Sequence, residues 1–199
     1  MDILVLGDEA MAQYHPLSRV REGIEISLKG LGKAEFCTEY HKLVLQELKK
    51  YPVIISYIDA FRQLSGFDEI LADYILEGGC ILALHNGIIT PEGSRLESIY
   101  GGNFVTHPHY CELEYITADY YWGKEERFVL AEEPYMIRRT GGHLQVFLWF
   151  MYENTRHEAG WLRKAGKGKV LYLAPGHDER TVRDVRFQKL LYHSITKII

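Results

Sequence analysis

Continuous apolar segments alternate with amphipathic ones along the first half of the sequence. Ile3–Leu6, Val53–Tyr57 and Cys80–Leu84 are short and almost wholly apolar, a pattern typical of strands buried on both faces of a parallel sheet. Between them, the apolar residues of Val20–Leu28 and Phe67–Glu77 recur at helical spacing. This alternation predicts a doubly wound α/β fold with a mainly parallel central sheet.

The sequence after Gly101 has fewer helical segments. Gly166–Lys169 predicts a hairpin turn, because it lacks the spacing of a phosphate-binding loop and precedes a strand. We expect Gly101–Tyr152 to form an excursion packed at the sheet edge, inserted before the last strand and helix. The elements expected in this half are the strands Glu112–Thr117, Phe128–Leu130, Val146–Met151 and Val170–Ala174 and the helix Val185–Lys197.

Length and composition favour one compact unit. The chain has 199 residues, of which 47% are hydrophobic and 25% charged, as in an ordinary globular domain, so we expect a single domain over residues 1–199. A net charge of −4 and the lack of a Lys or Arg run argue against nucleic acid as a partner. No apolar run approaches the roughly 18 residues of a membrane span, which argues against a membrane partner.

Cysteine and aromatic content add two expectations. Cys37, Cys80 and Cys111 are odd in number and form no CxxC pair, which favours the reducing cytoplasm. Met1–Gly7 lacks the basic end and long apolar run of a secretory signal. The 14 Tyr and 3 Trp residues exceed what a core needs, so we expect some rings to line a wet pocket or the subunit interface of a homo-oligomer.

Polar side chains follow the predicted strands at their carboxyl ends. Ligands of doubly wound sheets bind at this edge, so these positions are the first candidates for a site. The strand ends supply Asp8, Glu9, Asp59, His85, Asn86, His177, Asp178 and Glu179, and the excursion adds His107, His109, Glu132, Glu133 and Tyr135.

Two of these positions resemble amidotransferases with a Cys-His-Glu triad. Ala83–Gly87 lies where that family has Gly-x-Cys-x-Gly, the sharp turn that exposes a nucleophile, and His177–Glu179 keeps its His-x-Glu spacing. Position 85 is histidine, and neither Cys80 nor Cys111 can replace the missing thiol, since a nucleophile must lie within hydrogen-bond reach of its base. We therefore expect no glutamine hydrolysis.

The sequence more closely resembles the ThuA-like family, named for trehalose utilisation, over residues 54–198. The resemblance implies a flavodoxin-like, glutamine amidotransferase-like fold without the catalytic cysteine, and a link to trehalose or related sugar metabolism. Its motifs are Gly78-Gly79, Tyr100–Phe104 followed by His107-Pro108, Glu132–Tyr135, and Gly166–Val170 leading to Gly176–Asp178.

The sharpest site hypothesis brings His85, His107, Glu133 and His177 into one pocket. Three imidazoles and a carboxylate could hold Zn²⁺ or another divalent metal at roughly 2.0–2.2 Å. Without metal, His85, His177 and Glu133 could act as general acid and base. The alternative is that each histidine only caps a strand end or hydrogen-bonds a loop.

Further residues are candidates for substrate binding. Asn86, His107 and Tyr135 are placed there by their motifs, and Trp122 lies in a loop-like aromatic stretch that could contact a sugar or form a subunit interface. Asp178 could orient the ring of His177 or simply begin a helix. Glu132 is expected to be solvated, because adjacent residues point apart.

Two function classes remain open. One is an enzyme of carbohydrate metabolism that acts on a sugar or keto-sugar by acid–base or metal-assisted chemistry. The other is a non-catalytic sugar-binding or assembly module on an amidotransferase-like fold that has lost its nucleophile. Convergent His and Glu side chains favour the first, and a pocket filled by Tyr and Trp rings favours the second.

Overall fold

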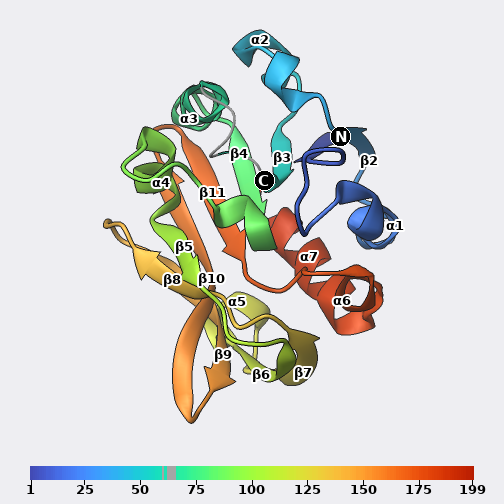
Figure 1. Ribbon diagram of the computed structural model, residues 1–199, viewed down its shortest axis with the longest axis vertical. Helices are drawn as coiled ribbons and strands as arrows, with labels where there is room; N and C mark the ends of the chain where they lie inside the picture. The colour runs from blue at the N-terminus through green and yellow to red at the C-terminus, as the bar shows by residue number, and fades with distance from the viewer. Residues whose placement is uncertain (60, 62–65) are drawn as a thin grey trace.

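A computed structural model describes residues 1–59, 61 and 66–199, and a mixed sheet is its central feature (Figure 1). Within the described residues, nine strands follow the order β2-β1-β3-β4-β11-β10-β9-β6-β7. The first five are parallel to one another. They are β2 (Lys33–Cys37), β1 (Asp2–Gly7), β3 (Val53–Tyr57), β4 (Cys80–Leu84) and β11 (Gly168–Leu173).

Helices cover both faces of the parallel strands, which confirms the doubly wound α/β prediction (Figure 1). One group packs together on one face and consists of α1 (Leu17–Ser27), α6 (Glu179–Arg183) and α7 (Val185–Ile198). The other face carries α3 (Phe67–Leu76) and α4 (Arg95–Tyr100), with the short α2 (Leu45–Leu48) beside α3 and a 3₁₀ turn, η1 (Tyr40–Lys42), before α2. The central parallel strands β1, β3, β4 and β11 are mostly apolar because both of their faces are buried, whereas the edge strand β2 carries Lys33 and Glu35 and is only partly buried.

The segment expected to pack at the sheet edge instead joins the sheet. Its strands and the strand that follows the segment pair antiparallel with one another and with β11, so they extend the sheet by hydrogen bonds. They are β6 (Cys111–Thr117), β7 (Arg127–Glu132), β9 (Gln145–Tyr152) and β10 (Thr155–Ala165), with α5 (Asp119–Trp122) between β6 and β7. A separate two-stranded ribbon is formed by β5 (Gly102–Thr106) and β8 (Met136–Arg139).

The hairpin predicted at Gly166–Lys169 joins β10 to β11. Ala165 pairs with Gly168 across the turn, and Gly166 takes the positive φ of 57° that a tight turn needs. Lys167 donates its backbone N–H to Leu76 at the end of α3. The turn therefore connects two strands and anchors on a helix.

Neighbouring strands of the parallel half end at one edge. Leu84 at the end of β4 lies opposite Leu173 at the end of β11, and Gly7 at the end of β1 lies opposite Tyr57 at the end of β3. The loops after these strands consequently meet, and the site is built from them. No helix among the described residues is long and apolar enough to cross a membrane.

Candidate functional site

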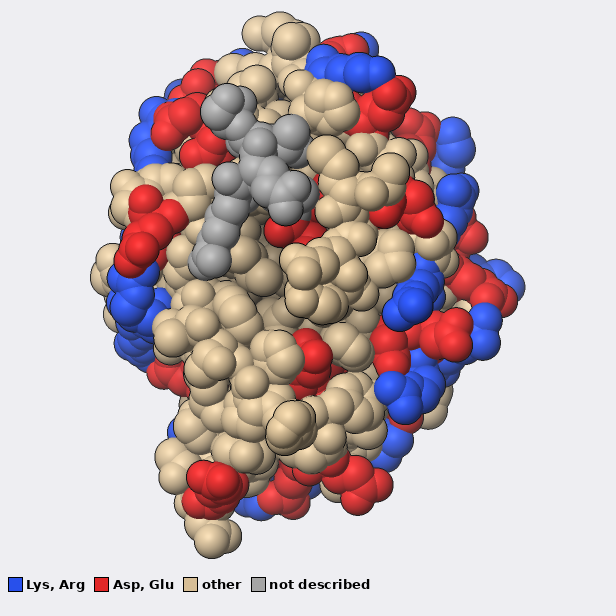
Figure 2. Space-filling view, viewed as in Figure 1, with Lys and Arg blue, Asp and Glu red and all other residues tan. Residues whose placement is uncertain are grey.

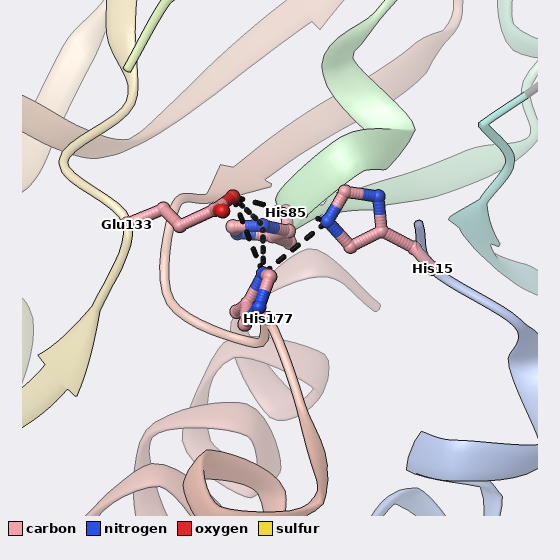
Figure 3. Close-up of side chains that lie close together, drawn as sticks. All are labelled: His15, His85, Glu133 and His177. Atoms are coloured by element: carbon pink, nitrogen blue, oxygen red, sulfur yellow. Dashed lines mark hydrogen bonds and ion pairs between the residues drawn. The ribbon is translucent and has the colours of Figure 1, made fainter. Parts of the chain in front are cut away.

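Four loops bring His15, His85, Glu133 and His177 together at this edge (Figure 3). His15 lies between β1 and α1, and His177 lies between β11 and α6. His85 begins the 3₁₀ helix η3 (His85–Ile88) directly after β4, and Glu133 follows β7. One donor atom from each side chain lies within 4.8 Å of all the others. We call these four residues the His/Glu cluster.

His177 lies in the middle of the His/Glu cluster. Its Nδ1 is 3.3 Å from Nε2 of His15 and 3.4 Å from Nε2 of His85. The same atom is 3.2 Å from Oε2 of Glu133. That carboxylate oxygen is also 3.6 Å from Nε2 of His85 and 3.9 Å from Nε2 of His15.

The outward-facing nitrogens of two histidines have acceptors of their own. Nδ1 of His85 lies 2.6 Å from the carbonyl oxygen of Ala174, to which it must donate a proton. Nδ1 of His15 lies 3.5 Å from Oδ2 of Asp59, an ion-pair distance without a hydrogen bond. An acceptor on one ring nitrogen fixes the tautomer and leaves a lone pair on the other nitrogen. In His85 the nitrogen left free is the Nε2 that faces the cluster, and the Nε2 of His15 faces it as well.

A tight turn sets the position of His85. Its φ of 48° lies in the left-handed region, which is uncommon for a residue with a side chain. Gly87, two residues on, approaches the β3 backbone so closely that a Cβ would lie 1.9 Å from the carbonyl oxygen of Ser56. Asn86 is fully buried and donates its Nδ2 to the carbonyl oxygen of Tyr57. The turn where amidotransferases present a thiol thus presents an imidazole here.

Burial and mutual contacts divide the charges within the cluster. Burial lowers the pKa of His85 to about 4, so that this ring is neutral near pH 7. Burial acts to raise the pKa of Glu133, but the neighbouring imidazoles of His15, His177 and His85 lower it well below its usual range. Burial acts to lower the pKa of His15, and Asp59 and Glu133 more than reverse this, so that its pKa is raised. The Glu133 carboxylate is therefore ionised, and the His85 ring next to it is neutral, so that its Nε2 can serve as a metal ligand.

Glu132 corrects the expectation that it would be solvated. Its side chain is completely buried, and its Oε1 accepts the backbone N–H groups of Gly176 at 2.8 Å and His177 at 3.2 Å. Burial raises its pKa to about 7. The side chains of Glu132 and Glu133 do point in different directions. Both nevertheless point into the protein, because the chain leaves β7 and crosses the loop that carries His177. Glu132 fixes the backbone of that loop, and Glu133 faces its side chain.

The donor set and its spacing fit a divalent metal ion. Zinc binds imidazole nitrogen and carboxylate oxygen at roughly 2.0–2.2 Å, and a tetrahedron with bonds of that length has edges of about 3.3–3.6 Å. The five distances above, 3.2 to 3.9 Å, lie close to that edge length. Outer acceptors such as Asp59 and the Ala174 carbonyl are the usual support of metal-bound histidines.

His107 does not take the ligand position predicted for it, which His15 occupies instead. Its Nδ1 lies 2.9 Å from the carbonyl oxygen of Pro108 and 3.7 Å from Oε1 of Glu133, the oxygen that faces away from the cluster. Together with Tyr135, it lines a cavity of about 250 Å³ that opens beside His15. The Tyr135 ring also lies 4.0 Å from the ring of His85. Both residues thus border the cluster from the side where a small molecule could enter.

Asp178 and Trp122 lie outside the cavity. Asp178 caps α6 by accepting the N–H groups of Arg180 and Thr181 and pairs with the guanidinium of Arg180, so the helix-start interpretation describes its contacts. Trp122 lies with its ring 4.5 Å from that of His193 on α7. We correct its assignment as a sugar contact of this pocket, which leaves the subunit-interface alternative as a prediction.

Sequence analysis missed His15 as a member of the site, although it named Asp59 among the polar residues at the strand ends. Both residues follow strands whose carboxyl ends form the edge of the site. Residues 9–16 contain no motif that marks His15 as a ligand. The His15 ring reaches His177 only because this loop folds back over the edge of the sheet. Backbone N–H groups of Tyr14 and Leu17 anchor this loop on Asp59 and on the Asp8 carbonyl oxygen.

The cysteines are distant from this chemistry. Cys37 lies in β2, Cys80 begins β4 with its Sγ 3.2 Å from the carbonyl oxygen of Ile198, and Cys111 begins β6. All three are free thiols, and burial raises the pKa of each. None of them has the low pKa of an activated nucleophile.

Comparison with known proteins identifies the family. The family model described as ThuA, trehalose utilisation, matches residues 5–196. The chain belongs to the ThuA family. A search of curated proteins found no match.

Solved structures share the ThuA fold at low sequence identity. A ThuA-like protein from Bacteroides uniformis is 16% identical with a TM-score of 0.80, and the match covers 100% of this chain and 91% of that one. A ThuA-like protein from Parabacteroides merdae is 12% identical with a TM-score of 0.79, covering 100% and 89%. A β-galactosidase from Rahnella sp. R3 is 12% identical with a TM-score of 0.66, covering 98% of this chain and 31% of that chain. These likenesses show the fold alone.

Proposed function

We propose that the His/Glu cluster binds a divalent metal ion such as zinc and that this ThuA-family protein binds or converts a sugar or keto-sugar in the adjoining cavity. The observation that carries the metal is the convergence of four donor atoms within 4.8 Å of one another, with the inward lone pair of His85 fixed by the Ala174 carbonyl and the Asp59 carboxylate 3.5 Å from Nδ1 of His15. The sugar rests on the family's description as trehalose utilisation.

Each residue of the site has a separate role. A bound metal ion supplies Lewis acidity to a carbonyl or hydroxyl oxygen. His15, His85 and His177 hold the site, and the ionised Glu133 balances its charge. Glu132 fixes the His177 loop from behind through two backbone N–H groups. Tyr135 excludes water from the buried side of His85, which it covers.

The setting of this activity is also part of the proposal. The free thiols of the three cysteines support a reducing compartment, the cytoplasm. We propose a small sugar ligand and a homo-oligomer as the partners, with neither nucleic acid nor membrane. The net charge of −4 supports the exclusion of nucleic acid.

A sugar-binding module without catalysis is the alternative function. The aromatic rings of Phe104 and Tyr135 in the cavity lining support it, because such rings can hold a sugar without reacting with it. The convergence of three imidazoles and a carboxylate favours the enzyme, since a binding module has no need of this donor set.

Metal analysis of protein purified without a His-tag tests the proposal. We expect about one divalent metal ion per chain, and His85→Asn should lose most of it, because asparagine tolerates the positive φ but offers no imidazole. His143→Asn is the matched control, since His143 lines a separate hollow with Gln145 and Arg163. Metal-free wild type after growth with added zinc, or equal metal in both variants, would refute the metal site.

The same preparations should then be screened against glucose, fructose and other sugars and keto-sugars. If the protein is an enzyme, wild type should consume a sugar or keto-sugar and His85→Asn should not. Binding without turnover in both proteins would support the alternative.

A further inference from the structure

We infer that the cavity beside the His/Glu cluster takes a single sugar ring and leaves the second ring of a disaccharide outside. This inference rests on the proposed function and names its substrate class as a monosaccharide, or one terminal unit of a larger glycoside. Three features carry it: the volume of the cavity, its aromatic wall, and the residues at its rim.

The cavity is small. Its volume is about 250 Å³, below the roughly 300–1,000 Å³ of pockets that enclose drug-sized ligands. A disaccharide has about twice the heavy atoms of a monosaccharide, so a space of this size that encloses one ring cannot enclose two.

One side of the cavity is a continuous aromatic wall. The ring of Tyr135 lies 4.5 Å from that of Phe104 and 5.8 Å from that of His107, with an angle of 24° between the planes of Tyr135 and His107. Tyr135 is almost completely buried, which fixes the wall in place. The Phe104 and Tyr135 ring planes meet at 48°, so the wall is angled. Aromatic lining of this kind suits the carbon-bound hydrogens of a pyranose ring, as apolar lining does in small-molecule sites generally.

The wall leads directly to the His/Glu cluster. Tyr135 lies 4.0 Å from the ring of His85, and His107 lies 3.7 Å from the Glu133 carboxylate. Asp59 and His15 line the cavity as well and bring polar atoms to it. A ring lying on the wall therefore turns the hydroxyl groups of one edge toward the cluster and those of the opposite edge toward the entrance.

The entrance is formed by side chains that extend into solvent. Met11 is 39% exposed and Tyr14 is 64% exposed, and Gln13 donates its Nε2 to the Tyr14 hydroxyl at 2.8 Å. Figure 2 shows that Lys and Arg gather toward the rim of the face it displays, while the centre carries mostly other residues. A second sugar ring would lie over Met11 and Tyr14, whose side chains extend into solvent.

Binding measurements on the zinc-loaded full chain test the inference, with D-glucose and D-fructose as single-ring probes and trehalose and maltose as two-ring probes. Isothermal titration should show at least one single-ring probe binding about tenfold more tightly than either disaccharide. Phe104→Ala should weaken that binding by about tenfold, because it removes half of the aromatic wall. Val105→Ala is the control, since Val105 is the next residue of β5 and its side chain is 57% exposed.

Several results would overturn the inference. Trehalose or maltose binding as tightly as the single rings would do so, as would binding of no probe to a zinc-loaded protein. Equal effects of Phe104→Ala and Val105→Ala would also reject the aromatic wall. Zinc content and circular dichroism of each variant verify that it is folded and loaded. A wild-type chain that takes up no zinc contradicts the proposed function, whereas a loaded chain without size preference contradicts only this inference.

Discussion

His85 combines three constraints that rarely meet in one residue. It is fully buried, has a φ of 48°, and donates Nδ1 to the Ala174 carbonyl at 2.6 Å. A backbone in this region costs on the order of 1–3 kcal/mol and persists only where the surroundings enforce it. Here the close approach of Gly87 to Ser56 enforces it.

The neutrality of His85 predicts how acid affects the metal-free protein. Burial lowers its pKa to about 4, against about 6.5 in the unfolded chain. Between these two pKa values the unfolded state binds a proton that the folded state does not bind. The free energy of unfolding therefore falls as pH falls from 6.5 to 4. The contribution of His85 is up to about 3 kcal/mol.

Urea unfolding of chelator-treated protein between pH 7 and 4 measures this effect. His85→Asn should flatten the decline relative to wild type, and His143→Asn should follow wild type. The comparison of variants isolates His85 from the other groups that titrate in this range. An unchanged slope in His85→Asn would show that the ring is protonated in the folded state.

Asp59 predicts a second effect at the residue scale. Its carboxylate lies 3.5 Å from Nδ1 of His15 and supports the tautomer whose Nε2 faces the cluster. Asp59→Asn should weaken zinc affinity by about 10–100-fold, the usual effect of losing an outer carboxylate. Competition with a chelating dye measures it. Asp73→Asn, on α3 and paired with Arg95, should leave the affinity unchanged.

Glu132 and Glu133 show where sequence reasoning stops at this scale. The motif position and the rule that neighbours point apart correctly separated the two carboxylates. The burial of Glu132 depends on the His177 loop. Its carboxylate accepts hydrogen bonds from two backbone N–H groups of that loop, which lie 44 and 45 residues further along the sequence. No local pattern encodes such a contact, so a buried carboxylate was expected to be solvated.

At the scale of elements, a buried acid joins the ends of two parallel strands. Asp8 follows β1, accepts the Tyr40 hydroxyl with Oδ1 at 2.6 Å and accepts the Asp59 N–H with Oδ2 at 2.7 Å. It therefore fixes the loop after β3 relative to β1. Because Asp59 supports His15, this contact extends the support of the cluster into the sheet.

The start of α7 gives a stability prediction that is independent of the site. Asp184 caps this helix by accepting the N–H of Arg186 at 2.8 Å. Asp184→Ala should lower the free energy of unfolding by about 1 kcal/mol, as loss of an N-cap usually does. Asp184→Asn keeps an accepting oxygen and should cost less.

Urea unfolding measures both Asp184 variants, and zinc content should stay at the wild-type value. An equal loss in the two variants would assign the effect to the ion pair with Arg186 instead of the cap.

Elements with strong local patterns were predicted, and those with weak patterns were not. Phe67–Glu77 and Val185–Lys197 were expected as helices and are α3 and α7 within one residue at each end. The eleven-residue β10 was missed, because Thr155–Ala165 mixes exposed charged residues with a buried centre and its pairing is irregular near Gly160. Its stability comes from β9 and β11 on either side.

At the scale of the whole molecule, topology explains what could be predicted of the site. Parallel strands end at a common edge, which predicted that His85 and His177 lie together, and the family motif added Glu133 from the excursion; the structure groups all three. The fourth donor could not be derived, because His15 and His107 both lie in loops at that edge. Only the folded positions of these loops show that His15 faces the cluster while His107 faces the cavity.

Metal binding should stabilise the entire fold. The donors come from four separate loops, so the ion holds the ends of β1, β4, β7 and β11 together. Zinc at one hundred times its dissociation constant should add about 2.7 kcal/mol, which raises Tm by about 5–10 °C in a chain of this length.

Differential scanning calorimetry with and without a chelator measures this shift. The shift should grow with zinc concentration in wild type and disappear in His85→Asn, whereas His143→Asn should retain it. A zinc effect of equal size in His85→Asn would place the ion elsewhere.

The separation of the donors along the sequence has a consequence for how such a site acquires its ion. His15 and His177 are 162 residues apart, so a ribosome makes one long before the other. During synthesis the growing chain offers only isolated imidazoles, which compete poorly with the cell's own chelators. On the proposed function, the ion is therefore chosen after translation by the finished scaffold, and the metal found in the protein records which ions are available in the compartment where it completes its folding.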